Sequence, residues 1–261
     1  MISKNKQKLL RQLEQKKHRA ATGLFVAEGP KVVGDLLAIG PAETLIATEE
    51  WATLHPDAET KEWIIVNEDE LRRVSFLQHP QQVMGTFALP HHEEDTEEAI
   101  RHITSELCLA LDGVQDPGNV GTIIRIADWF GIQHIYCSPD TADAYSPKVV
   151  QATMGSIARV EVVYTDLNLL AARLPEGTPV YGTVLDGEDL YSTPLTPHGL
   201  LVMGNEGKGI SAGMASRLTH RLLIPPYPAG RATADSLNVA IATAICCAEF
   251  RRRVKNLESE E

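Results

Sequence analysis

The chain has 261 residues, of which 43% are hydrophobic and 23% charged, as in a globular protein large enough for one or two domains. Its formal net charge of −11 argues mildly against a nucleic-acid partner. No apolar run approaches the roughly 20 residues of a membrane span, and no signal peptide opens the chain. The four cysteines form no C-x-x-C pair and no cluster with zinc-ligand spacing, so we expect a cytoplasmic protein with reduced thiols and no metal.

The first 20 residues are basic, in contrast to the chain as a whole. Leu9, Leu10 and Leu13 form a narrow apolar stripe that predicts one basic helix over residues 3–19. A local basic patch matters more to a polyanion than the global charge does, so this helix is a candidate RNA-binding element. The alternative is a helix that is basic only for solubility. The candidate RNA-binding residues are Lys4, Lys6, Lys8, Arg11, Lys16 and Lys17.

Residues 1–90 alternate between predicted strands and helices, which indicates a small α/β domain. Asn67 and Glu70 predict a capped helix start within it. The predicted strands are Leu24–Ala27, Thr44–Ala47, Trp63–Val66 and Val83–Leu89. Residues 91–105 are interpreted as a linker, and the pair His91-His92 is typical of a solvated linker rather than of a metal site.

The second domain, residues 106–261, begins with a predicted strand at Leu107–Leu111 and a helix whose buried stripe includes Val120 and Ile124. Arg125 lies off that stripe, and Asn119 lies at the start of the helix. Each has an ordinary interpretation, Arg125 as part of a solvated face and Asn119 as a helix cap. Further predicted elements are the strands 134–137, 160–164 and 180–185 and the helices 147–157 and 167–174. This alternation favours a mostly parallel sheet that is covered on both faces.

The common nucleotide-binding and hydrolase motifs are absent. The turn after the first strand of this domain, DGVQDPGNVG, does not match G-x-G-x-x-G, and Gly207-Lys208 lacks the surroundings of a P-loop. The sequence also lacks the G-x-S-x-G elbow of serine hydrolases. The ligand-binding loops are therefore expected in the last third of the chain.

Two strand-length apolar runs in that last third, Leu200–Met203 and Arg221–Ile224, each end in a turn rich in Gly or Pro. Asp235 and Ser236 are good N-cap residues and predict the start of the final helix. Residues 239–248 are apolar on all sides except at Thr243, so we expect them to be buried by the sheet and by a second copy of the chain.

Three segments carry a family resemblance: LDGVQDPGNVGTIIRIADWFGI (111–132), LVMGNEGKGIS (201–211) and IPPYPAGRATADSLNVAIA (224–242). In this order and at these separations they resemble the SpoU (TrmH-type) family of RNA ribose methyltransferases, within the SPOUT superfamily. The N-terminal segment is similar to the ribosomal-protein-like RNA-binding domain that often precedes the catalytic domain. The third segment departs from the commoner pattern, because its loop is longer and Ala240 stands where Ser is frequent.

The resemblance implies an α/β domain with a parallel sheet and a trefoil knot, which acts as a homodimer and transfers a methyl group from S-adenosylmethionine to a ribose 2′-hydroxyl. Ribosomal RNA is favoured over tRNA as substrate. The alternatives are a catalytically silent RNA-binding protein of the same fold and an α/β enzyme with a different nucleotide cofactor. The implied catalytic residues are Asn119, Arg125, Glu206, Ser236 and Asn238. The implied cofactor-binding residues are Thr183, Leu185, Met203, Gly204, Asn205, Gly207, Ile224, Pro225 and Leu237.

Overall fold

The computed structural model describes residues 2–90, 96–228 and 234–258, and the chain divides into two compact units. Unit 1 comprises Met1–His91 and Asp143–Ala158, and unit 2 comprises His92–Ala142 and Arg159–Glu261. This division places residues 92–105 in unit 2 and segment 143–158 in unit 1, whereas the sequence analysis placed 91–105 in a linker and 143–158 in the second domain. Residues 96–105 of the expected linker form a helix whose Ala99 and Ile103 are buried in unit 2. Both residues of the pair His91-His92, which the sequence assigns to the linker, lie outside the described residues, as do residues 93–95.

The basic N-terminus forms two helices, α1 (Lys4–Gln12) and α2 (Lys16–Thr22), so the prediction of one helix over 3–19 is wrong. The break follows from Arg19, whose buried guanidinium donates 2.7 Å hydrogen bonds to the carbonyls of Leu13 and Glu14. Those carbonyls are therefore not available to a continuing helix. Leu10 and Leu13 are fully buried, as the apolar stripe predicts.

The sheet of unit 1 has the strand order β1-β4-β2-β3, in which only β2 and β3 are parallel. Its strands are β1 (Leu24–Glu28), β2 (Thr44–Thr48), β3 (Trp63–Val66) and β4 (Val83–Ala88). Its helices include α3 (Pro30–Leu37), α4 (Glu49–Leu54) and α5 (Glu68–Val74). The capping box of Asn67 and Glu70 is confirmed at the start of α5. Helix α4 is a short element that the sequence analysis missed, although Thr48 caps it.

Segment 143–158 packs on β1 through α8 (Pro147–Ala152), whose Val149 and Val150 are buried. An ion pair of 2.6 Å joins Asp143 to the buried Arg19. The predicted helix over 147–157 ends early, and a 3-10 turn η1 (Ser156–Ala158) follows. The helix ends because Met154 (φ +53) and Gly155 (φ +96) both have positive φ, and Gly155 lies against Asp35, where a Cβ would approach the carboxylate oxygen to 2.2 Å.

Unit 2 is built on a parallel sheet with the strand order β10-β8-β9-β5-β6-β7. Its strands are β5 (Leu107–Asp112), β6 (His134–Cys137), β7 (Glu161–Tyr164), β8 (Val180–Asp189), β9 (Gly199–Gly204) and β10 (His220–Leu223). The mostly parallel sheet that the strand and helix alternation predicts is thus confirmed. Because all adjacent strands are parallel, their carboxyl ends lie at the same edge of the sheet.

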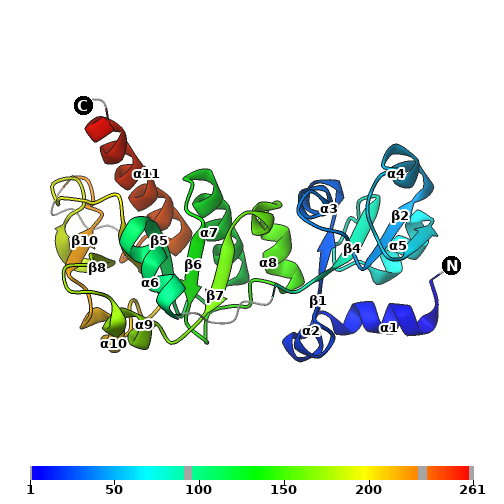
Figure 1. Cartoon of the computed structure of the whole chain (residues 1–261), viewed down its shortest axis with the longest axis horizontal. Coiled ribbons are helices and arrows are strands. Elements are labelled where there is room, and N and C mark those ends of the chain that lie inside the picture. The colour runs from blue at the N-terminus through cyan, green and yellow to red at the C-terminus, as the bar shows by residue number, and fades with distance from the viewer. Residues whose placement is uncertain (1, 91–95, 229–233, 259–261) are drawn as a thin grey trace. The chain divides into compact units, whose positions relative to one another are not determined.

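Helices cover both faces of this sheet (Figure 1). On one face, α6 (Thr96–Ser105), α9 (Leu167–Arg173) and α10 (Ala212–Ala215) share a buried core with Cys108, Ala110 and Val202. On the other, α7 (Pro117–Trp129) packs side by side with α11 (Val239–Glu258), and α11 also contacts β9. The alternating residues of β5 and β9 supply apolar side chains to both layers.

The strand order places the loops that follow β5, β9, β8 and β10 along one edge of the sheet. Strand β10 pairs with β8 on both sides of residues 183–187. Arg221 is opposite Gly182, and the next residue, Leu222, is opposite Glu188. Residues 183–187 therefore form an excursion at that edge. The trefoil knot stays a prediction, because strand order and register do not describe the threading of the chain.

Among the residues that the structure describes, no helix combines the length and apolarity needed to cross a membrane. All four cysteines lie in this part of the chain, and each is a buried free thiol.

Candidate functional site

The site begins at the amino end of α7, where the sequence left Asn119 open as a cap or a functional residue. The cap is Asp116, whose carboxylate accepts a 2.9 Å hydrogen bond from the backbone N–H of Asn119. Pro117 occupies the first helical position, where its missing N–H costs nothing. Asn119 therefore lies in the first turn of the helix, and its side chain is free to make contacts outside α7.

Glu206 joins the loop after β9 to the loop after β5. Its carboxylate accepts a 2.9 Å hydrogen bond from the Asn119 side chain and hydrogen bonds of 3.3 Å from the backbone N–H groups of Gln115 and Asp116. These donors lie at a helix start, which favours negative charge. The carboxylate therefore fixes the position of Asn119 relative to the sheet edge.

Asn238 continues the same hydrogen-bonded chain to the last helix. Its side-chain amide donates to Asn119 Oδ1 at 2.9 Å, and its Oδ1 accepts from the N–H groups of Ala240 and Ile241. Asn238 thus caps α11, and the prediction that Asp235 and Ser236 open this helix is wrong. One residue from each of the three family motifs is linked in the order Glu206, Asn119, Asn238.

The pKa of Glu206 is set by two opposing effects. Partial burial raises the pKa of the carboxyl, but the hydrogen bonds from Asn119 and from the backbone N–H groups of Glu206, Gln115 and Asp116 outweigh it. The pKa therefore lies below its ordinary value, and Glu206 is a carboxylate at neutral pH. A negative charge at this point can orient the polar groups around it without donating a proton.

Arg125 lies further along α7, with its side chain exposed and off the buried stripe of Ile123, Ile124 and Ala127, as the sequence predicts. It makes no hydrogen bond or ion pair with the residues that the structure describes. A guanidinium held by a helix but not engaged by protein groups is suited to a phosphate or a ribose oxygen.

Several predicted cofactor residues lie in loops that follow adjacent strands. Asn205 bridges two of these loops, because its amide donates to Gly113 O at 2.7 Å and its Oδ1 accepts from the N–H groups of Gly207 and Lys208. Gly204 is required by packing, since a Cβ there would lie 2.4 Å from the backbone of Gly209. The Thr183 hydroxyl lies 3.9 Å from the Met203 sulfur, at the point where the paired strands β8 and β9 reach this edge.

The other predicted cofactor residues supply apolar surface at the same edge. Leu185 is 72% exposed and Leu237 is 50% exposed, while Ile224 and Pro225 after β10 are half-buried. Exposed leucines of this kind suit a ligand with an apolar ring face and a polar end. Ser236 is exposed and makes no hydrogen bond with described residues, so the structure does not link it to Glu206, Asn119 and Asn238. Part of the lengthened loop, residues 229–233, lies outside the described residues.

Sequence reasoning missed two contributors to this edge. Asp112, at the end of β5, accepts a 2.6 Å hydrogen bond from the N–H of Ser211 and so ties the loop after β9 to β5. The backbone N–H groups of Gln115 and Asp116 hold Glu206, and backbone donors have no sequence signature. Asp116 could have been found, because Asp followed by Pro is a known helix start.

Comparison with known proteins matches both parts of the chain. The model of the SpoU rRNA Methylase family matches residues 106–248, and that of an MRM3-like substrate binding domain matches residues 4–85. The 23S rRNA (guanosine(2553)-2′-O)-methyltransferase RlmP of Bacillus subtilis is 32% identical over 244 residues, which cover 92% of this chain and 94% of that protein.

Solved structures agree with this. A putative RNA methyltransferase of the TrmH family from Porphyromonas gingivalis has a TM-score of 0.86 and 42% identity, with coverage of 97% of this chain and 99% of its own. An AdoMet-bound rRNA methyltransferase from Sinorhizobium meliloti has a TM-score of 0.81 and 32% identity, and the match covers 97% of each chain. The motifs, their meeting at one sheet edge and these matches agree that the chain belongs to the SpoU family of RNA methylases.

Proposed function

We propose that this protein transfers a methyl group from S-adenosylmethionine to a ribose 2′-hydroxyl of ribosomal RNA. The observation that carries the proposal is the hydrogen-bonded chain from Glu206 through Asn119 to Asn238, which joins the three family motifs. The named activities of the relatives support the same reaction and favour ribosomal RNA over tRNA. Free, buried cysteines support a reducing, cytoplasmic location.

S-adenosylmethionine supplies a methyl group on a positively charged sulfur, so the reaction needs alignment and removal of the hydroxyl proton. The loops 183–187, 203–207 and 224–226, with Leu237, would hold the cofactor. Arg125 would bind the phosphate next to the acceptor ribose and orient its 2′-hydroxyl. An arginine is a poor base because its guanidinium stays protonated, so positioning is the role that we assign to it.

Measuring which cofactor binds distinguishes a methyltransferase from an α/β enzyme that uses a different nucleotide cofactor. We expect calorimetry to show S-adenosylmethionine binding in the presence of a metal chelator, because the loops offer apolar surface and backbone donors. NAD and ATP serve as the comparison ligands. Binding of either of these in place of S-adenosylmethionine would contradict the proposal. A catalytically silent relative would bind the methyl donor and RNA but would not transfer the methyl group.

Unit 1 supplies RNA affinity in this proposal, although its basic residues are not equivalent. Lys6 forms an ion pair with Glu62 and donates to Thr44 at 2.8 Å, and Arg11 donates to the carbonyl of Arg73 at 2.6 Å. Both therefore also serve the fold of unit 1. Lys4, Lys8 and Arg11 share one face of α1 by their i, i+4, i+7 spacing, and all three are exposed. This face is the proposed phosphate contact.

Replacing Lys4, Lys8 and Lys17 together with glutamate is expected to weaken RNA binding by more than tenfold at low salt and to flatten its salt dependence. Affinity for S-adenosylmethionine should not change. A matched variant that reverses Lys31, Lys61 and Arg72 has the same net charge and disrupts only surface ion pairs, each worth about 0–1 kcal/mol. Equal loss of RNA binding in both variants would show a nonspecific charge effect.

We propose a homodimer because one face of α11 exposes apolar side chains. The other face of this helix is buried, but Ile241 is 53% exposed and shares a stripe with Ile245 and Ala248 by i, i+4, i+7 spacing. The helix is therefore not buried on all sides within one chain, and we propose that a second copy covers it. Light scattering should give a dimer for the wild type and a monomer for Ile241→Glu. Leu169→Glu, which alters an exposed leucine of α9, should remain dimeric. A monomeric wild type would refute this.

A further inference from the structure

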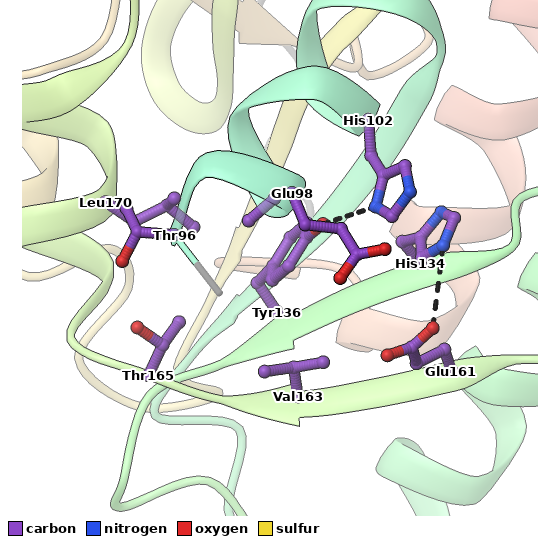
Figure 2. A pocket seen from close by; sticks show the side chains of 10 residues that line it. Thr96, Glu98, His102, His134, Tyr136, Glu161, Val163, Thr165 and Leu170 are labelled. Atoms are coloured by element: carbon purple, nitrogen blue, oxygen red, sulfur yellow. Dashed lines mark hydrogen bonds and ion pairs between the residues drawn. The ribbon is translucent and has the colours of Figure 1, made fainter. Parts of the chain in front are cut away.

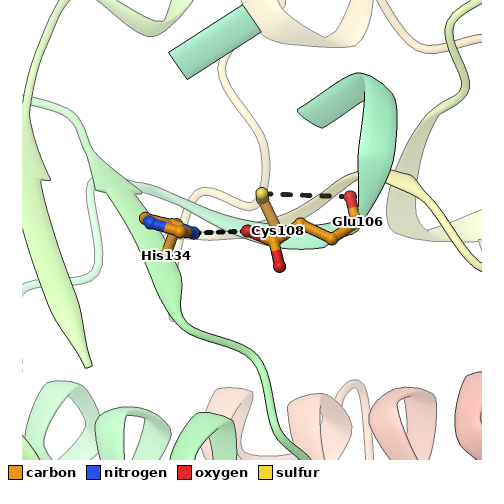
Figure 3. A group of neighbouring side chains, drawn as sticks. All are labelled: Glu106, Cys108 and His134. Carbon is orange, nitrogen blue, oxygen red and sulfur yellow. Dashed lines mark hydrogen bonds and ion pairs between the residues drawn. The ribbon is translucent and has the colours of Figure 1, made fainter. Parts of the chain in front are cut away.

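Possible metal ligands of different types meet at the opposite edge of the sheet in unit 2. Glu106 lies just before β5, Cys108 lies in β5, and His134 begins β6 (Figure 3). One ligand atom from each, a carboxylate oxygen, a thiol sulfur and a ring nitrogen, lies within 4.8 Å of the other two. Because β5 and β6 are parallel neighbours, their amino ends hold these side chains together. The motif loops lie at the carboxyl ends, so this cluster is separate from them.

His134 is oriented from both sides of its ring. Its Nδ1 lies 2.5 Å from Glu106 Oε1, and its Nε2 lies 3.7 Å from a carboxylate oxygen of Glu161, at the start of β7. The ring of His102 from α6 stacks on it with a centroid distance of 3.7 Å (Figure 2). In metal sites, the ligating histidine usually has a carboxylate partner on its second ring nitrogen. Glu161 is the carboxylate nearest to that nitrogen among the described contacts, at 3.7 Å, slightly beyond hydrogen-bond distance.

Cys108 is the member of the cluster that a hydrogen-bonded Glu–His pair does not explain. It is fully buried in the apolar core beneath α6, and among the residues that the structure describes its thiol makes one polar contact, a long one of 3.9 Å to the carbonyl of Glu106. Its sulfur lies beside a carboxylate and an imidazole, and one cation can bind a thiolate, a carboxylate and an imidazole at the same point.

We propose that Glu106, Cys108 and His134 bind a Zn²⁺ ion that stabilises the amino-terminal edge of this sheet. Thiolate, imidazole and carboxylate are the ligands that zinc prefers, and neighbouring ligand atoms in a tetrahedral site lie about 3–4 Å apart. The distances here, from 2.5 Å to within 4.8 Å, require only side-chain rotation to reach that spacing. A small adjoining cavity of about 30 Å³, lined in part by His102, His134 and Glu161, has room for one water as the fourth ligand (Figure 2).

The test uses Co²⁺ as a coloured substitute for Zn²⁺ on the full chain. Metal-free protein titrated with Co²⁺ should develop a near-ultraviolet thiolate-to-cobalt absorption band and reach one ion per chain, and Zn²⁺ should remove the band. Cys108→Ala should abolish the band. Cys137→Ala is the matched control, because Cys137 is also buried, lies on the neighbouring strand β6 and is not in the cluster. This control should keep both the band and the stoichiometry.

A second variant distinguishes the loss of a metal ligand from a folding defect. His134→Gln alters a mostly buried side chain near the strand edge and keeps the thiol, so it should weaken Co²⁺ binding by at least about tenfold. Thermal unfolding should confirm that the variant is folded. Zn²⁺ should raise the unfolding temperature of the wild type but not that of His134→Gln. A wild type without the absorption band, or a band that persists in Cys108→Ala, would overturn the proposal.

Discussion

Replacing Arg125 with alanine is expected to lower the rate of methyl transfer by about a hundredfold or more, while cofactor affinity and oligomeric state stay unchanged. The side chain is exposed and lies off the buried stripe of α7, so its loss opens no cavity in the core. Surface substitutions of this kind usually change the free energy of unfolding by less than about 0.5 kcal/mol. A large loss of activity would therefore reflect the reaction itself.

The conservative variant separates charge from geometry at this position. Arg125→Lys keeps the positive charge but loses the planar guanidinium that binds two oxygens at once, so we expect it to be nearly as impaired as the alanine variant. Arg173→Ala, which removes an exposed arginine from α9 of the same unit, is the matched control and should retain activity. Near-normal turnover of Arg125→Ala on the true RNA substrate would refute the role proposed for this residue.

Replacing Glu206 with glutamine is expected to lower methyl transfer by about tenfold to a hundredfold, because Asn119, which also accepts from Asn238, is positioned by the Glu206 carboxylate. A glutamine has one acceptor oxygen in place of two, and its –NH2 group cannot accept the hydrogen bonds that the replaced oxygen receives from Asn119 or from the N–H groups of Gln115 and Asp116. Asn119 would then shift relative to α11. Glu176→Gln removes an exposed carboxylate elsewhere in unit 2 and should not affect the rate.

The depressed pKa of Glu206 gives this prediction a pH dependence. The carboxylate is favoured by folding, so its contribution to stability is complete above the unfolded pKa of about 4.3 and disappears as the pH falls through the lower folded pKa. Wild-type stability should therefore fall more steeply in acid than that of Glu206→Gln, as measured by urea unfolding between neutral and acidic pH. Parallel curves for the two proteins would contradict the hydrogen-bonded role of the carboxylate.

Most strands were predictable from the sequence, because their apolar runs are short and end in clear turns, as at Leu107 and His134. The incorrect predictions concern helix ends and a segment whose positions depend on contacts between residues far apart in the sequence. The buried Arg19 binds the carbonyls of Leu13 and Glu14, just beyond the last residue of α1, and α8 ends before Met154 and Gly155, which both have positive φ. Segment 143–158 is held in unit 1 by the packing of α8 on β1 and by the ion pair between Asp143 and Arg19, contacts between residues far apart in the sequence.

The candidate site was predicted through motifs rather than through contacts. Asn119, Glu206 and Asn238 were named from the family resemblance, and only the structure shows that they form one hydrogen-bonded chain. The role of Asn238 as the cap of α11 was hidden, because Asp235 and Ser236 are equally good caps in sequence terms. The cluster of Glu106, Cys108 and His134 has no spacing signature, since parallel strands bring it together.

The most direct test of methyl transfer to ribose is mass spectrometry of ribosomal RNA from cells that lack this protein, after incubation with the purified enzyme and S-adenosylmethionine. The proposal predicts one new 2′-O-methylated nucleotide, absent when Arg125→Ala replaces the wild type. A methyl group on a base, or no methylation of RNA by an enzyme that binds the cofactor, would contradict it.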